Sequence, residues 1–345
     1  MQPLMNRWLF KFAPKVAIAI CDDAFFFQSL DIAEPLRIPA YAGVAVENGN
    51  VLVVGNEPCD WEVCPPSLTR SRVVDSGFVV DSAGAGAIMR SGFRQLFPGR
   101  ILRARPTVVL ACRAGGERHA LARRAVVEAG AAEVYMIEHP MAALIGLDVD
   151  VQGADLSAIL TVSNDWFSFA IVSLSGIVAS CDGSMGVEDL VRDIRIHCRL
   201  TRGFVPDEKA VAVALWRNGF ADSGGYPAAG WTTWLGKSGL GERDTRVLDT
   251  GLLCDGAMPT VLRISERIQT LIENLPSETR ARMNSVTIHG TGCAMGIAQF
   301  ARLMERQIGM RIKPSLDKPQ PAVAGALKAI AEIPFLRRVT KNARA

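Results

Sequence analysis

The chain has 345 residues, a formal net charge of +3 and an apolar fraction of 49%. This length suffices for two domains, or one large lobed domain, around a buried core, and the composition is ordinary for a globular protein. The small net charge gives no indication of nucleic-acid binding, and no apolar run reaches the length of a transmembrane helix. We therefore predict neither a nucleic-acid partner nor a membrane-spanning segment.

The N-terminal segment, residues 1–15, has an amphipathic pattern with Trp8, Leu9 and Phe12 on one side and cationic residues on the other. Such a segment can lie in a membrane interface or pack on the adjoining domain. Eight scattered cysteines without a CxxC pair indicate free thiols, and no metal site is predicted. Together these features predict a cytoplasmic protein, with peripheral contact at the inner face of the plasma membrane as an open possibility.

The first half of the chain reads as a strand meander followed by alternating helices and strands. We expect strands at 16–21, 24–30 and on both sides of the turn at 47–50, a loop at 61–72, and a helix at 83–96. A strand at 107–112, a helix at 117–129, a strand at 134–137 and a helix from Pro140 to Gly146 follow. This succession predicts an α/β lobe over residues 16–150.

The same order begins again with three predicted strands over residues 157–181 and a helix over 187–198. We therefore predict a second lobe over residues 151–332 and a cleft between the two copies. Within it, residues 219–259 suggest a divergent subdomain of short strands and loops. Helices at 260–275 and 321–332 and a strand–turn–helix unit over 286–308 complete the lobe. The basic tail, residues 333–345, is expected to be solvated.

Several ordered segments carry a resemblance to a known family. Residues 133–146 (EVYMIEHPMAALIG), 169–180 (FAIVSLSGIVAS) and 285–312 around HGTGCAMG resemble, in order, segments of the MreB family of bacterial actins. The resemblance covers roughly residues 75–332, is weaker over 16–58, and is poor over 219–259. It implies an α/β actin-like fold of two duplicated lobes around a nucleotide cleft, with ATP and Mg²⁺ as the family's cofactors.

The positions that match the family's first phosphate loop lack its chemistry. The resemblance places a metal-side carboxylate at Ala19 and a glycine at Cys21, and Asp22 adds negative charge where a phosphate would lie. Because the carboxylate is replaced by a methyl group, we predict that this loop is degenerate.

The second phosphate loop matches Thr161 and the turn Ser163, Asn164, Asp165 and Trp166. The family's carboxylate becomes Thr161, and its glycines become three residues with side chains. Asp165 is anionic and Trp166 is bulky, so both are expected to oppose a bound phosphate. We predict that this loop is degenerate as well.

Two further positions leave alternatives open. His139 matches the family's water-orienting glutamate and reads either as a general base or as a histidine that only begins a helix, while Glu138 matches the preceding acidic residue. Gly290, Thr291 and Gly292 match the adenosine loop and could hold a nucleoside, although a glycine turn is expected between any strand and helix. No catalytic residue is predicted, and the sequence leaves open whether ATP with Mg²⁺ binds.

These features predict a cytoskeletal or scaffold protein, acting in cell shape or intracellular organisation, with lost or very weak ATPase activity. It would self-associate or join a related actin-like filament. Two alternatives stay open: an actin-fold ATP-binding enzyme, which needs a Mg²⁺ site, and a non-polymerising adaptor that tethers machinery to a membrane.

Overall fold

The structure, a computed structural model, describes residues 13–21, 23–98, 105–113, 116–220, 232–237, 243–316 and 320–342. These residues form two compact units. Unit 1 comprises residues 1–155, 172–177 and 318–345, and unit 2 comprises residues 156–171 and 178–317.

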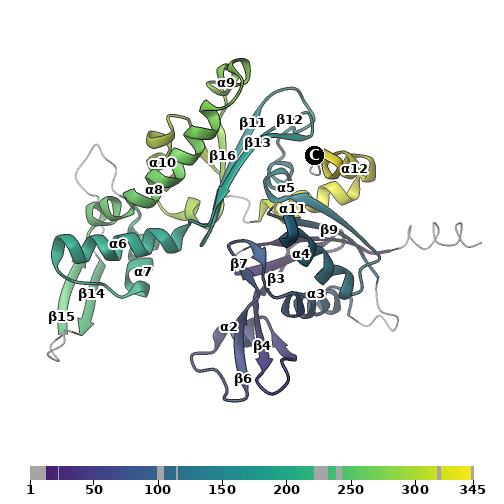
Figure 1. Ribbon diagram of the computed structural model, residues 1–345, viewed down its shortest axis with the longest axis horizontal. Helices are drawn as coiled ribbons and strands as arrows, with labels where there is room; N and C mark the ends of the chain where they lie inside the picture. The colour runs from purple at the N-terminus through teal and green to yellow at the C-terminus, as the bar shows by residue number, and fades with distance from the viewer. Residues whose placement is uncertain are drawn as a thin grey trace, which may run out of the picture. The chain divides into compact units, whose positions relative to one another are not determined.

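Unit 1 is built on a five-stranded sheet with the strand order β10-β9-β1-β2-β3. Two of its strands, β3 and β9, are labelled in Figure 1. Its central strands are parallel, with Val16 opposite Val108 and Val108 opposite Val134, whereas β1 and β2 are antiparallel. The strands are β1 (Lys15–Ile20), β2 (Ala24–Ser29), β3 (Leu36–Pro39), β9 (Thr107–Cys112) and β10 (Glu133–Glu138).

Two pairs of helices accompany this sheet. Helices α3 (Ser82–Leu96) and α4 (Gly116–Glu128) share one core with alternate residues of β1, including Val16, Ile18 and Ile20. Helix α11 (Pro321–Ala331) contacts β1 and β9 and packs on α5 (His139–Gly146). Because strand residues alternate between faces, the buried alanines Ala17 and Ala19 lie on the face opposite the α3–α4 core.

The α5–α11 contact is a close backbone approach. A Cβ added at Gly146 would lie 1.8 Å from the carbonyl oxygen of Pro321, and one added at Gly325 would lie 1.8 Å from that of Ala142. Glycine is therefore required at both positions by space, since each helix touches the other's main chain.

The remaining elements of unit 1 are small. A three-stranded sheet with the order β5-β4-β6 lies beside the short helix α2. The elements are β4 (Tyr41–Ala45), β5 (Val51–Val54), α2 (Asn56–Asp60), β6 (Leu68–Arg72), β7 (Val74–Asp75), β8 (Phe78–Val79) and the C-terminal α12 (Ile333–Asn342).

Unit 2 repeats the topology of unit 1, with the strand order β13-β12-β11-β16-β17 (Figure 1). Alternate residues of β11 and β12 share a core with α6, α8 and α10. The elements are β11 (Ser157–Val162), β12 (Phe167–Ser173), β13 (Gly176–Gly183), α6 (Val187–Arg202), α7 (Glu208–Asn218), β14 (Thr232–Lys237), β15 (Arg243–Leu248), α8 (Thr250–Glu273), α9 (Ser277–Met283), β16 (Ile288–Thr291), the 3₁₀ helix η1 (Cys293–Gly296), α10 (Phe300–Ile308) and β17 (Ile312–Pro314).

The predicted duplication is confirmed, because β3-β2-β1-β9-β10 and β13-β12-β11-β16-β17 have the same order along the chain. The helix expected from Pro140 to Gly146 is also confirmed as α5. The expectation of a loop over 61–72 is wrong in its second half. Residues Leu68–Arg72 form β6, which pairs with β4 at the edge of a small sheet. Its mostly polar side chains do not show the apolar pattern by which a strand is predicted.

Two expectations for the second half of the chain need correction. Residues 250–259 belong to α8 and not to a loop-rich subdomain, because the Asp249 side chain accepts a hydrogen bond from the Leu252 N–H and caps the helix. Of the basic tail, residues 333–342 form α12, in which Phe335, Leu336 and Val339 are buried while Arg337 and Arg338 are exposed. An amphipathic spacing thus explains why this segment packs.

The domain boundaries drawn from the sequence stay a prediction. The compact units differ from them at three places, because residues 151–155, residues 172–177 and the segment that holds α11 belong to unit 1, whereas the sequence division put them in the second lobe.

Candidate functional site

In unit 1 the turn between β1 and β2 is closed by main-chain hydrogen bonds. The Cys21 N–H donates to the Ala24 oxygen at 3.0 Å, and the Ala40 N–H donates to the Asp23 oxygen at 2.7 Å. The Cys21 thiol donates to Oε1 of Gln320 at 3.5 Å. Asp22, which the sequence singles out, lies outside the described residues.

The charged side chains at this turn pair with each other and face solvent. The Asp23 carboxylate forms an ion pair with Arg37 at 2.5 Å, and both side chains are nearly half exposed. Ala19 is fully buried and contributes a methyl group where the resemblance expects a carboxylate. Of the described residues, this turn therefore presents a neutralised aspartate and no oxygen at the expected metal-side position.

Glu138 and His139 lie where β10 ends and α5 begins. Burial raises the pKa of the Glu138 carboxyl. Burial, reinforced by the positive charge of Arg113, lowers the pKa of His139 to about 4. The imidazole is therefore neutral at pH 7 and is a weaker base than an ordinary histidine.

Arg113 is a site residue that the sequence analysis missed. It follows the last residue of β9, is 5% exposed, and donates from Nη1 to the Ser76 carbonyl oxygen. Its guanidinium carbon lies 4.3 Å from the centre of the Phe78 ring, and that of Arg118 lies 4.9 Å from the same centre. An arginine directly after a buried apolar strand was the signal available in the sequence.

In unit 2 the turn Ser163–Trp166 between β11 and β12 is closed without glycine. The Ser163 N–H donates to the Trp166 oxygen at 2.8 Å. Trp166 is fully buried and Asp165 is 7% exposed, so neither side chain stands free on the surface of the protein. The turn thus keeps the strand–turn–strand frame with side chains at each position where the family has glycine.

Helix α6 begins directly on this turn. The Val187 N–H donates to the Ser163 oxygen at 3.0 Å, and the Glu188 N–H donates to the Asn164 oxygen at 2.8 Å. A Cβ on Gly186 would lie 2.4 Å and 2.5 Å from these two carbonyl oxygens. Two of the N–H groups that a helix leaves unpaired at its start are therefore satisfied by the turn itself.

The predicted adenosine loop lies against the same turn. The hydroxyl oxygens of Thr161 and Thr291 are 2.8 Å apart, on neighbouring positions of the parallel strands β11 and β16. The Cys293 thiol donates to Oδ1 of Asn164 at 3.1 Å. Gly292 has φ +90°, and a Cβ there would lie 2.3 Å from the Val162 oxygen, so this position requires glycine.

The described residues do not fit the Mg²⁺–phosphate group that the resemblance implies. Mg²⁺ is usually held through carboxylates and water, and phosphate through main-chain N–H groups of glycine-rich turns. Ala19 offers no oxygen, the Thr161 hydroxyl is hydrogen-bonded to Thr291, and the Ser163 N–H is bonded to Trp166. Within the described ranges, no group of three or more His, Cys, Asp or Glu side chains is placed to hold a metal ion.

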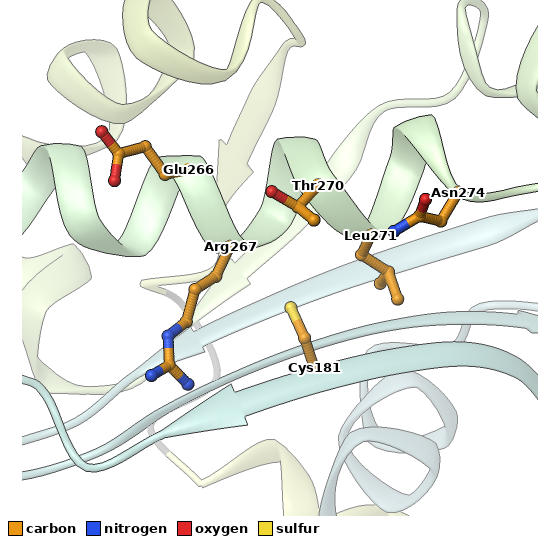
Figure 2. Close-up of a pocket in the computed structure, with 6 residues that line it drawn as sticks. All are labelled: Cys181, Glu266, Arg267, Thr270, Leu271 and Asn274. Atoms are coloured by element: carbon orange, nitrogen blue, oxygen red, sulfur yellow. The ribbon is translucent and has the colours of Figure 1, made fainter.

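A separate hollow lies between β13 and α8 in unit 2 (Figure 2). Its volume is about 490 Å³, and it is lined by Cys181, Glu266, Arg267, Thr270, Leu271 and Asn274. Burial raises the pKa of the Cys181 thiol to about 12, so the thiol is protonated at pH 7. The Arg267 Nη1 donates to the Asp182 oxygen at 3.1 Å. No residue predicted for the nucleotide site lines this hollow.

The predicted membrane-contact residues Trp8, Leu9 and Phe12 lie outside the described residues. Among the helices that are described, none is long and apolar enough to cross a membrane.

The family model and the curated relatives that match this chain point to the same family. The family model described as MreB/Mbl protein matches residues 35–210, just over half of the chain. The chain is 31% identical over 147 residues to the cell shape-determining protein MreB of Haemophilus influenzae, a match covering 42% of each protein. It is 29% identical over 125 residues to MreB of Escherichia coli K12, covering 36% of that relative. The matched part thus spans less than half the length of these curated relatives.

Solved structures extend the similarity over nearly the whole chain. The crystal structure of MreB5 of Spiroplasma citri bound to AMPPNP has a TM-score of 0.79 at 16% identity and covers 96% of this chain and 99% of that one. A MamK double helical filament has a TM-score of 0.71 at 14% identity and covers 92% and 99%. At these identities the likeness shows the fold, and the α/β actin-like fold predicted from the sequence is confirmed.

Proposed function

Because the chain belongs to the MreB/Mbl family, we propose that it is a cytoskeletal or scaffold protein acting in cell shape or intracellular organisation. It self-associates or joins a related actin-like filament, and its ATPase activity is lost or very weak. The likeness to a MamK filament supports self-association. A role in cell shape is supported by the curated relatives, which are described as cell shape-determining proteins.

The proposal that ATPase activity is lost rests on the two positions where the family has carboxylates beside the metal, because neither has a carboxylate in this chain. One is the methyl group of Ala19, which is fully buried, and the other is the Thr161 hydroxyl, bonded to Thr291. Phosphoryl transfer in nucleotide hydrolases depends on a metal that neutralises the developing charge. A site without carboxylate oxygens at these positions does not favour that metal. Assembly is therefore proposed to proceed without a hydrolysis cycle.

The test measures assembly and turnover in one set of reactions. Purified full-length protein is sedimented with Mg·ATP, with Mg·ADP, and without nucleotide, and phosphate release is followed in parallel. We expect pelleting to be equal in the three conditions and phosphate release to stay at the no-protein background. Turnover that disappears in Asp165→Asn would contradict the proposal and favour the ATP-binding enzyme. Protein that stays monomeric in every condition would favour the adaptor.

Peripheral membrane contact through the N-terminal segment is a separate proposal. It is supported by the apolar residues Trp8, Leu9 and Phe12 beside cationic ones. Deletion of residues 1–12 should reduce co-sedimentation with vesicles that contain anionic lipid. Equal co-sedimentation of the deleted and full-length chains would reject it.

A further inference from the structure

Two segments of unit 2 lie at the ends of the paired strands β11 and β16, and side chains join them in addition to that pairing. One is the end of β11 with its turn, residues 161–166, and the other is the end of β16 with η1, residues 291–296. Two hydrogen bonds cross between them: one joins the Thr161 and Thr291 hydroxyls at 2.8 Å, and in the other the Cys293 thiol donates to Oδ1 of Asn164 at 3.1 Å. We call these four side chains the bridge.

The bridge connects residues far apart along the chain. Its two pairs are separated by 130 and 129 positions. Thr161 and Thr291 are 2% and 3% exposed, so water does not readily replace either partner of that bond. The backbone adds to the contact, because Gly292 leaves no room for a Cβ against the Val162 oxygen.

We propose that the bridge takes the place of a bound nucleotide in fixing these two segments to each other. The resemblance assigns phosphate to the first segment and the nucleoside to the second, so an ATP molecule on both would link them from outside. Here the link is made by the protein's own side chains. This inference rests on the proposed function, namely assembly without ATP turnover. It adds to that function the contact that replaces the nucleotide.

The chemistry of the bridge fits a permanent link. Its bonds join uncharged hydroxyl, thiol and amide groups, so its strength does not depend on Mg²⁺ or on the charge of a phosphate. Thr161, Asn164 and Thr291 also stand at positions where the resemblance expects contact with the ligand or its metal, and here each uses a donor or acceptor within the bridge. A link of this kind stabilises one arrangement of the two segments and leaves no switch between a loaded and an empty state.

Hydrogen exchange followed by mass spectrometry on the full-length protein tests the bridge. Asn164→Ala should increase amide exchange about tenfold in its own turn and also in residues 291–296, since losing one partner opens both segments. Cys293→Ala should give the same two-sided pattern from the opposite side. The matched control is Asn284→Ala, which removes an exposed asparagine at the end of α9 in the same unit.

Thr161→Val with Thr291→Val provides a second measurement that does not depend on one variant folding. Each single change should increase exchange in both segments, and the double change should increase it by less than the product of the two. Excess Mg·ATP should leave exchange in the wild-type segments unchanged. Exchange confined to the mutated segment, or strong protection of both wild-type segments by Mg·ATP, would overturn the bridge. Failure of nucleotide-independent pelleting with the two-sided exchange pattern intact would instead count against the proposed function alone.

Discussion

The two strand–turn–strand hairpins that begin the two units occupy the same place in the same sheet order, but different forces hold them. In unit 1 the β1–β2 turn and its surroundings carry charges, namely the Asp23–Arg37 ion pair and the buried Arg113 beside His139. In unit 2 the β11–β12 turn is held by main-chain bonds to α6 and by the uncharged bridge. One topology therefore tolerates two unrelated ways of satisfying its polar groups.

This difference has consequences for how the two halves respond to change. Contacts between charges depend on pH and salt, whereas close backbone contacts and neutral hydrogen bonds depend on shape. The β11–β12 turn should therefore be sensitive to a single added methyl group, and the β1–β2 turn and its surroundings to protonation and ionic strength. The following variants test that contrast, beginning with the largest expected effect.

Among the variants at the two turns, Gly186→Ala should be the most damaging. The φ of Gly186 is −163°, an extended value open to any residue, so the effect comes from space alone. The added Cβ would meet two main-chain oxygens at 2.4 Å and 2.5 Å, and these cannot move without breaking their bonds to α6. We expect a loss of about 3 kcal/mol in the free energy of unfolding, measured by urea denaturation.

Gly203→Ala, just past the end of α6, is the matched control for that variant. Gly203 has φ +71°, but a Cβ there would meet nothing within 4 Å. Its replacement should cost about 1 kcal/mol, through backbone strain only. If the two variants lose equal stability, the close docking of α6 on the turn is not what holds unit 2.

Much of the fold followed from the sequence because it depends on local patterns. Pro140 at a helix start and Gly146 at its end predicted α5, and short apolar runs predicted the repeated strands. The site positions were predicted one by one, but their partners were not. The Thr161–Thr291 and Asn164–Cys293 bonds join residues about 130 positions apart, and no local pattern encodes which side chains meet across such distances.

The interpretation of single substitutions was limited for the same reason. Ala19 was read as a lost carboxylate, and the structure adds a packing reason, since it lies on the sheet face opposite the α3–α4 core, where α11 contacts β1. Arg113 was not singled out, because its neighbours Ser76 and Phe78 come from a separate hairpin. The tail at 333–342 was read from its charge, while its burial depends on the spacing of Phe335, Leu336 and Val339.

The pH dependence of unit 1 should follow His139. Its pKa is about 4 in the fold, below the ordinary 6.5, so between these values the unfolded chain binds the proton and the folded chain does not. The contribution of His139 to stability is therefore complete above about pH 6.5 and falls as the pH is lowered toward 4, by about 3 kcal/mol. The raised pKa of Glu138 acts in the opposite direction, so a difference measurement is needed.

His139→Gln removes the titrating group, and the difference between variant and wild-type stability isolates its contribution. That difference should shrink as the pH is lowered from 7 to 4.5, measured by urea denaturation at each pH. His197→Gln, at a half-buried histidine of α6, controls for loss of a histidine elsewhere. If the unfolding free energies of the variant and the wild type change with pH in parallel, protonation of His139 is not linked to unfolding.

The smallest effect is expected at the Asp23–Arg37 ion pair. Both side chains are nearly half exposed, so water screens their attraction. A double-mutant cycle with Asp23→Asn and Arg37→Gln should give a coupling of about 0.2–1 kcal/mol. Raising the salt from about 0.1 M to 1 M shortens the screening length from roughly 10 Å to 3 Å and should remove most of this coupling. The bridge coupling between Thr161 and Thr291 should survive the same salt, because it joins uncharged groups. If both couplings fall together, the contrast between an ion pair at the turn of unit 1 and an uncharged bridge at the turn of unit 2 is wrong.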